Sequence, residues 1–327
     1  MKILVTGGAG FIGSNFIHYI LETYPDYKIT NLDCLSYAGN LENLSDIAKN
    51  KNYKFVKGNI KDFKLVSKLI KKTDYVINFA AQTHVDRSIK EAAEFVETNV
   101  NGVFTLLEAS RNSKIKLFMQ ISTDEVYGST LEGSFIETDL LCPSSPYSAS
   151  KAASDCLCNA YAATYKIPVI ITRCSNNFGP YQYPEKVIPL FVTNLLKGKK
   201  APLYGDGLNV RDWIYVYDHI RAIDFLMHKG KPAEIYNISS NNEVANIELT
   251  KLILKKFGLD ETYIKYVQDR PAHDRRYSLD SSKLRLLGWK PVYDFSASLD
   301  ATIGWYKENT KWWKKIRPSM KYQSKAR

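Results

Sequence analysis

The first 170 residues alternate between short apolar runs and longer amphipathic segments, and this alternation constrains the fold more than any other feature. The runs have strand length and are rich in Val, Ile and Leu, as strands covered on both faces require. We therefore predict an α/β fold built on a doubly wound parallel sheet. The predicted strands are Lys2–Thr6, Lys28–Asp33, Tyr53–Lys57, Tyr75–Phe79, Lys116–Ser122 and Val169–Arg173. The predicted helices span about 12–24, 62–72, 92–112 and 147–165.

The pattern changes after Asn177, where several prolines and glycines follow one another and indicate loops and short elements. Helical periodicity returns near 186–197, 217–228, 246–257 and 296–307. A strand-like run, Glu234–Ile238, is expected to return to the first sheet. We expect a first domain over 1–178 and a smaller α/β substrate-binding domain over 179–327, with the chain crossing back to the first.

A glycine-rich turn follows the first predicted strand and opens the first predicted helix. Gly7, Gly10 and Gly13 allow a tight turn and the close approach of a pyrophosphate to the backbone, which the free N–H groups of the helix would bind. Asp33 ends the second strand, where a carboxylate accepts hydrogen bonds from ribose hydroxyls and repels a 2′-phosphate. The sequence thus predicts a dinucleotide-binding Rossmann domain that prefers NAD to NADP.

Two short segments carry reactive groups. Thr123, Asp124 and Glu125 follow the strand Lys116–Ser122 at the sheet edge where such folds bind ligands. Tyr147 and Lys151 are four residues apart on a predicted helix and share a face, so the ammonium, together with the nicotinamide cation, is expected to favour phenolate. In a chain with 22 tyrosines this pair alone could be coincidental, and the Asp-Glu pair alone could cap a turn. Their joint position favours proton transfer.

Charge and cysteine content exclude other classes. The net charge is +11, but seven of these charges come from Lys311–Arg327, which has no acidic residue, so a solvated tail is favoured over a nucleic-acid site. Five cysteines form no disulfide framework, and Cys156 and Cys158 point to different helix faces, so no metal site is expected. The sequence shows no membrane span and no secretory signal pattern, and a cytoplasmic location is expected.

Over nearly its full length the chain resembles the extended short-chain dehydrogenases/reductases, and closely the nucleoside-diphosphate-glucose 4,6-dehydratases, especially those that act on dTDP-glucose. The Thr-Asp-Glu segment is its most specific part, because related 4-epimerases carry small or hydroxylated residues in place of Asp124 and Glu125. The segments that carry the resemblance are 5–15, 84–88, 122–128, 172–177, 204–207, 210–213 and 269–276.

The resemblance implies an internal oxidation followed by loss of water. Tyr147 would take the proton of the glucose C4 hydroxyl while C4 gives a hydride to NAD, with Lys151 holding the nicotinamide ribose. Thr123 would hydrogen-bond the C4 oxygen. Glu125 would remove the C5 proton, and protonated Asp124 would give a proton to the departing C6 hydroxyl. The hydride then returns to C6, which yields the 4-keto-6-deoxy sugar.

Further binding residues are implied only by the resemblance. Arg211 and Arg270 are also plausible diphosphate partners on chemical grounds, since a guanidinium matches phosphate oxygens, although a surface ion pair is the alternative. The residues implied to bind NAD are Gly7, Gly10, Phe11, Ile12, Gly13, Asp33, Cys34, Leu35, Ser36, Asn59, Ile60, Phe79, Ala80, Ala81, Thr83, Thr98, Tyr147, Lys151 and Asn177. Those implied to bind the nucleotide-sugar are Thr83, Thr123, Asn176, Lys186, Val187, Pro202, Leu203, Tyr204, Arg211, Asn246, Asp269, Arg270, His273 and Tyr322.

The sequence leaves the nucleotide base, the reaction and the oligomeric state open. UDP-glucose 4,6-dehydratases share the catalytic set, so the base is not fixed, and a UDP-sugar 4-epimerase is the other enzymatic alternative. The resemblance implies a homodimer through the helices near 92–112 and 147–165, whereas the sequence shows only that these helices could pack. A non-catalytic nucleotide sensor is disfavoured by the intact proton-transfer residues.

Overall fold

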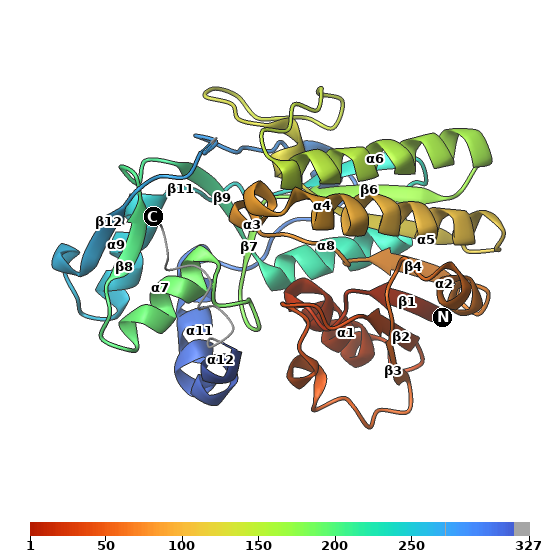
Figure 1. The fold of residues 1–327 in the computed structure, drawn as a ribbon, viewed down its shortest axis with the longest axis horizontal. Helices are drawn as coiled ribbons and strands as arrows, with labels where there is room; N and C mark the ends of the chain where they lie inside the picture. Colours follow the sequence, from red (N-terminus) through yellow and green to blue (C-terminus); the bar gives the residue numbers. More distant parts are fainter. Residues whose placement is uncertain (272, 317–327) are drawn as a thin grey trace.

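The computed structural model describes residues 1–271 and 273–316, and a seven-stranded parallel sheet forms its centre (Figure 1). The strands lie in the order β10-β6-β5-β4-β1-β2-β3. Chain order reverses at β1, which pairs with β2 on one side and with β4 on the other. In such sheets the reversal opens a crevice at the carboxyl ends of the strands. The bounds are β1 Lys2–Thr6, β2 Lys28–Asp33, β3 Tyr53–Lys57, β4 Tyr75–Asn78, β5 Leu117–Thr123, β6 Val169–Cys174 and β10 Glu234–Ile238.

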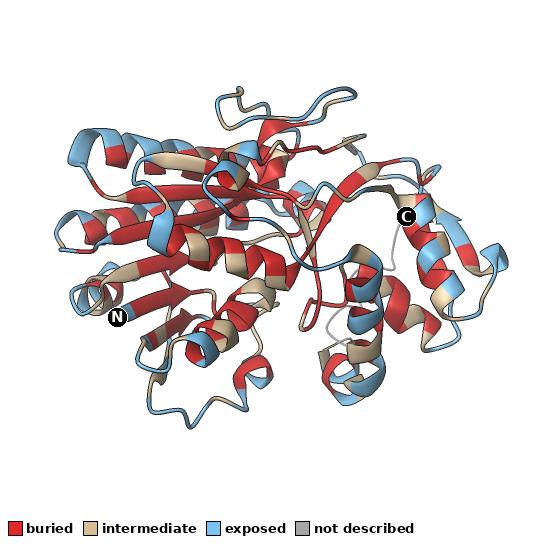
Figure 2. Cartoon of the chain, turned by 180° about the vertical axis from the view of Figure 1, so that it is seen from behind, coloured by how far each residue is buried: buried red, intermediate tan, exposed pale blue. Residues whose placement is uncertain are grey.

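Helices cover both faces of this sheet, because successive strand residues point to opposite sides. Ile3 and Val5 of β1 pack in one buried cluster with side chains of α1 and α8, whereas Leu4 packs in another with α2, α5 and α6. Figure 2 shows the strands buried between the helices, whose outer faces are exposed. These helices are α1 Phe11–Thr23, α2 Phe63–Ile70, α5 Gly102–Arg111, α6 Pro146–Tyr165 and α8 Val216–Lys229.

A second lobe lies beside the carboxyl ends of the strands and has its own core (Figure 1). Phe178, Trp213 and Leu249 pack there against aromatic side chains of the last helices, including Trp313. Its strands are β7 Asn176–Phe178, β9 Val210–Tyr215 and β11 Glu243–Ala245 in one sheet, and β8 Ala201–Tyr204 and β12 Ile264–Val267 in another. Its helices are α7 Val187–Leu195, α9 Asn246–Lys256, α11 Phe295–Glu308 and α12 Thr310–Ile316.

Short elements complete the described chain. They are the 3-10 turns η1 Leu41–Leu44, η3 Asp124–Tyr127 and η4 Glu261–Tyr263, the helices α3 Val85–Lys90, α4 Ala92–Phe95 and α10 Ser282–Leu286, and the π-helical turn η2 Val96–Asn101. Within the described residues, no helix combines the length and apolar character needed to cross a membrane. The same residues contain no group of three or more His, Cys, Asp or Glu side chains placed to hold a metal ion.

The predicted α/β doubly wound sheet is confirmed, with the first three strands at the predicted residues and the next three within one residue at each end. The segment 92–112 is a run of α4, η2 and α5 instead of one uniform helix. β10 pairs with β6, so the chain does return to the first sheet. The strands β7, β8, β9, β11 and β12 were not predicted, because the prolines and glycines around them indicated loops. The boundary at residue 178 stays a prediction.

Candidate active site

A cavity of about 300 Å³ lies at the carboxyl ends of β1, β2, β4, β5 and β6, where the order of the sheet reverses. Of the nineteen residues implied to bind NAD, Leu35 is the exception that does not line it. The Leu35 backbone has a left-handed φ of 57° and donates its N–H to Asp33 Oδ1 at 2.8 Å. Leu35 therefore shapes the turn beside the cavity and does not form part of its wall.

The glycine turn fits a phosphate group. A Cβ at Gly7, where φ is +71°, would lie 2.5 Å from the Ala80 nitrogen, and one at Gly13 would lie 2.6 Å from the Gly7 oxygen. A Cβ at Gly10 would lie 3.3 Å from the Gly7 oxygen, closer than an ordinary van der Waals contact. Gly10 precedes α1 with extended backbone, and within the described chain no side chain caps this helix. Its first N–H groups can therefore face an anion.

Asp33 lies at the end of β2 on the wall of the same cavity. Its Oδ2 accepts the Ala9 N–H at 2.9 Å, and burial raises the pKa of its carboxyl, while the hydrogen bonds from the Leu35 and Ala9 N–H groups lower it. These two backbone contacts fix the carboxylate next to the glycine turn. The arrangement fits the ribose of a dinucleotide whose phosphates lie at α1.

The reactive side chains come from β5, η3 and α6. Thr123 accepts the Glu125 N–H at 3.3 Å and donates its hydroxyl to Asp124 Oδ1 at 3.1 Å. α6 begins with a capping box in which Ser145 and Ser148 bond each other's backbone N–H groups, so the first turn that carries Tyr147 is fixed. One turn further, the Lys151 ammonium donates to the Ile121 carbonyl at 2.6 Å.

The two adjacent carboxyl groups differ in burial and in the charges that act on their pKa values. Asp124 is 4% exposed, and burial together with the charge of Glu125 raises its pKa to about 8. Glu125 is half-buried at the cavity wall; burial raises its pKa, while the charges of Arg270, Lys186 and Arg211 lower it. At neutral pH Asp124 is thus mostly protonated. The pair can offer an acid and a base side by side.

The pKa of Tyr147 differs from the sequence expectation. Burial and the charge of Glu125 raise it well above its usual value, although a hydrogen bond with Thr123 lowers it. Lys151 is itself buried, and burial lowers its pKa. The expected lowering of the Tyr147 pKa by Lys151 is therefore not found among the protein groups alone, because burial and the neighbouring carboxyl groups of Glu125 and Asp124 oppose it.

The residues expected to bind the nucleotide-sugar fall into two groups. Thr83, Thr123, Asn176 and Lys186 line the cavity, and the Lys186 ammonium donates to the Thr83 carbonyl at 3.1 Å. The others lie outside its lining, on β8, β9, the start of α7, the start of α9 and the segment after β12. They are Val187, Pro202, Leu203, Tyr204, Arg211, Asn246, Asp269, Arg270 and His273. Tyr322 lies outside the described residues.

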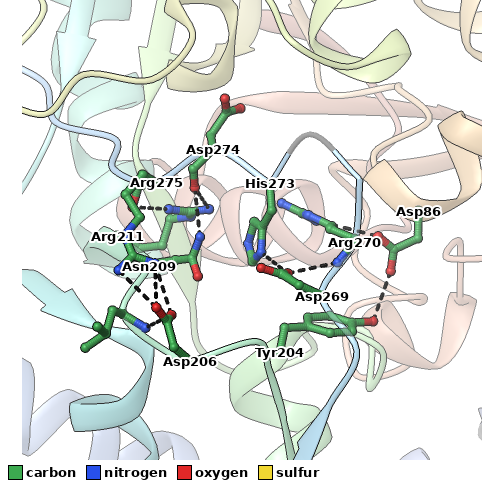
Figure 3. A network of polar contacts seen from close by, with 11 residues as sticks. Asp86, Tyr204, Asp206, Asn209, Arg211, Asp269, Arg270, His273, Asp274 and Arg275 are labelled. Carbon is green, nitrogen blue, oxygen red and sulfur yellow. Dashed lines mark hydrogen bonds and ion pairs between the residues drawn. The ribbon is translucent and has the colours of Figure 1, made fainter.

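Figure 3 shows how the polar members of the second group are held. Asp86, which follows β4, lies 3.6 Å from the Arg270 guanidinium and accepts a hydrogen bond from the Tyr204 hydroxyl. The buried Arg211 donates to the Asp274 carbonyl at 2.8 Å and packs over the Tyr277 ring. Arg270 thus forms the ion pair that the sequence left as an alternative, whereas Arg211 contacts backbone carbonyls.

The sequence missed several residues of the cavity wall. Tyr37, Tyr181, Glu185 and His219 line it without belonging to a motif. The imidazole of His219, which is buried and has a pKa lowered to about 3 by that burial, lies 2.8 Å from Asn177 Oδ1 and orients this amide. The one signal that the sequence offers for His219 is a polar residue among the apolar positions of a predicted amphipathic helix.

This fold, with the glycine turn and the Tyr147–Lys151 pair at one cavity, defines an extended short-chain dehydrogenase/reductase. The model of the family described as GDP-mannose 4,6 dehydratase matches residues 4–302, and the chain belongs to this family.

Individual relatives agree with this assignment. The chain is 48% identical to the low-salt glycan biosynthesis protein Agl12 of Haloferax volcanii over 94% of its length and 98% of that protein. It is also 48% identical to a dTDP-glucose 4,6-dehydratase of Streptomyces niveus, with 97% and 96% covered. The structure of DesIV, the dTDP-glucose 4,6-dehydratase of Streptomyces venezuelae with NAD bound, superposes with a TM-score of 0.95 at 48% identity, covering 97% of this chain and all of that one.

Proposed function

We propose that this chain is an NAD-dependent hydro-lyase that converts dTDP-glucose into dTDP-4-keto-6-deoxy-glucose and water. The observation that carries the proposal is the pair of adjacent carboxyl groups in the cavity, of which Asp124 is held protonated by burial. An enzyme that only oxidises an alcohol has no need of this pair. Full-length similarity to relatives with this activity in their names supports the proposal.

NAD, when bound, would supply the hydride acceptor for C4 of the glucose and the hydride donor for C6. Gly7, Gly10 and Gly13 would hold its pyrophosphate, and Asp33 its ribose. Lys151 would hold the second ribose. Because the hydride returns within the same turnover, the cofactor is not consumed.

The side chains of the site move the protons. Tyr147 would accept the proton of the C4 hydroxyl as a phenolate, which the positive charge of bound nicotinamide would favour, while Thr123 hydrogen-bonds the same oxygen. The resulting C4 ketone acidifies the neighbouring C5–H bond, and Glu125 removes that proton. Asp124 donates its proton to the C6 hydroxyl, which leaves as water while the C5–C6 double bond forms. After the hydride reaches C6, a proton returns to C5.

The substrate would extend from the cavity toward the second lobe. Lys186 and Thr83, which line the cavity, would lie on the sugar side, and Arg270 and Arg211, which lie outside its lining, would bind the diphosphate. The remaining residues of the second group would surround the base. Residues 179–327 are proposed as the substrate domain.

Incubation with dTDP-glucose and, separately, UDP-glucose followed by mass spectrometry tests the proposal. We expect the dTDP-sugar to lose the mass of one water molecule. An unchanged mass with an altered sugar configuration would instead identify a 4-epimerase, and dehydration of UDP-glucose alone would assign the other base. No turnover with any nucleotide-hexose would favour a non-catalytic role.

We further infer a homodimer through η2, α5 and α6. These helices carry large apolar side chains that are exposed in the single chain, namely Val96, Phe104 and Tyr165. Exposed apolar groups gathered on neighbouring helices are typical of a subunit contact. A cytoplasmic location stays a prediction from the sequence.

A further inference from the structure

Ala9, in the middle of the glycine turn, is held from two sides. Its N–H donates to Asp33 Oδ2 at 2.9 Å, so the turn and the ribose carboxylate are fixed to each other. Its carbonyl accepts the Asn40 N–H at 2.9 Å and the Asn43 side-chain amide at 3.0 Å. Asn43 belongs to η1 and is 1% exposed. The position of the turn therefore depends on a buried side chain outside the cavity lining.

The side-chain oxygen of Asn43 accepts a hydrogen bond from a residue of the second lobe. Asn43 Oδ1 accepts the indole N–H of Trp312 at 2.8 Å, and Trp312 lies on α12. An indole N–H can only donate and a carbonyl can only accept, so these two partners fix which way the amide points. A continuous path of hydrogen bonds thus joins Trp312 to Asn43, to Ala9 and to Asp33.

Neighbouring contacts strengthen this junction between the lobes. Lys315 of α12 forms an ion pair with Glu42 of η1. The ring of Tyr181, which lines the cavity, packs edge-on against Trp305, with centroids 4.9 Å apart, and also contacts Trp312. α12 consequently contacts both the support of the glycine turn and the cavity wall.

We propose that Trp312 and Asn43 are positioning residues that retain the cofactor, with α12 acting as a latch on the glycine turn. This inference rests on the proposed function, since it assigns the retained group as NAD. The chemistry supplies a reason for retention: the hydride taken from C4 must return to C6 of the same sugar. Loss of the reduced cofactor between these steps would leave an oxidised sugar without the hydride that its C6 needs.

The chain offers a matched pair of substitutions on one helix. Trp312→Phe removes the N–H that reaches Asn43 and keeps an aromatic ring for packing. Trp313→Phe removes an N–H that donates to the Tyr306 carbonyl at 2.8 Å, a contact within the second lobe. Both tryptophans are buried, so a general loss of packing would affect the two variants alike.

The experiment measures the rate at which NAD leaves the purified full-length holoprotein, by gel filtration after timed dilution and quantification of the retained nucleotide. We expect Trp312→Phe to release NAD about tenfold faster, as the loss of one buried hydrogen bond predicts. Trp313→Phe should release NAD at the wild-type rate. Asn43→Ala should act like Trp312→Phe, and the double variant should be no faster than Asn43→Ala, because both changes break one path.

Turnover at saturating added NAD gives a second measurement. We expect kcat of Trp312→Phe to return to the wild-type value, since its reactive groups are unchanged. Equal release rates for Trp312→Phe and wild type, or for the two tryptophan variants, would overturn the latch. So would a low kcat of Trp312→Phe that added NAD does not restore. If the wild type itself binds no NAD, the proposed function fails instead.

Discussion

At the scale of single residues, the chemistry depends on what surrounds Asp124 and Glu125. The two carboxyl groups are neighbours in the chain and both line the cavity, yet Asp124 is buried and Glu125 is half-buried. Burial with a like charge beside it keeps a carboxyl group protonated. The motif supplies the two groups, and their environment assigns which one holds a proton.

Glu125→Gln should stop the reaction after the first oxidation. C4 can still lose its hydride, but no base removes the C5 proton, so reduced cofactor should accumulate while dehydration falls at least about 100-fold. The absorbance of bound NADH after addition of dTDP-glucose measures this. Glu108→Gln, on α5 and hydrogen-bonded to Tyr161, is the control and should turn over normally. Dehydration by Glu125→Gln at the normal rate would show that another group is the C5 base.

The raised pKa of Asp124 makes stability depend on pH. Between its ordinary value of 3.8 and about 8, the folded protein binds this proton more tightly than the unfolded chain, so rising pH through this window lowers the free energy of unfolding. The slope from one such group is at most about 1.4 kcal/mol per pH unit. Asp124→Asn should therefore gain stability relative to the wild type as pH rises from 5 to about 8, measured by Tm. A constant difference across this range would contradict the burial of an ionisable Asp124.

At the scale of elements, α1 and the glycine turn pack too closely for any side chain at Gly13. The nearest contact of an added Cβ is a backbone oxygen, which cannot move aside without shifting the turn. The sequence motif indicated this turn correctly. The structure adds that its third glycine lets the start of α1 pack against the backbone of Gly7 and Gly8.

Gly13→Ala should lower the free energy of unfolding by about 1–3 kcal/mol and abolish NAD retention, since the turn is displaced. Gly304→Ala is the matched control on α11, where an added Cβ would meet no described atom within 4 Å. There the lower chain entropy of alanine should stabilise the helix by about 0.5–1 kcal/mol. Urea unfolding and nucleotide quantification measure both. Equal effects of the two substitutions would refute the packing argument.

At the scale of the whole molecule, the two lobes are joined by α8 and β10, which pack on the first sheet, and by α12, which contacts η1. The cavity lies beside this junction, so cofactor and substrate would be bound by different lobes. The outer surface of η2, α5 and α6 faces away from it and remains available for a second copy of the chain (Figure 1).

Phe104→Glu should convert the proposed dimer to monomers, because the side chain is 46% exposed in the single chain and a charge placed at an apolar subunit contact must be desolvated. Light scattering coupled to gel filtration gives the mass. Leu286→Glu, at an 88% exposed position on α10, is the control and should leave the mass unchanged. A wild-type monomer, or a dimer that survives Phe104→Glu, would reject this interface.

The sequence by itself determined the succession of strands and helices in the first half of the chain and the glycine turn, and it predicted Asp33 and the proton-transfer groups. These follow from local periodicity and from spacing within single strands and helices, which the fold preserves. It did not reach the strands of the second lobe, whose proline- and glycine-rich surroundings indicated loops, or the wall residues Tyr181 and His219, which lie outside the motifs.

Only the tertiary structure decided how the site is tuned. The raised pKa values of Asp124 and Tyr147 and the pairing of Arg270 with Asp86 come from burial and from groups brought together from distant segments. The contact of Trp312 with Asn43 spans 269 positions of the chain. Such effects depend on distance in space and on exclusion of water, and neither is encoded in the spacing of residues along the sequence.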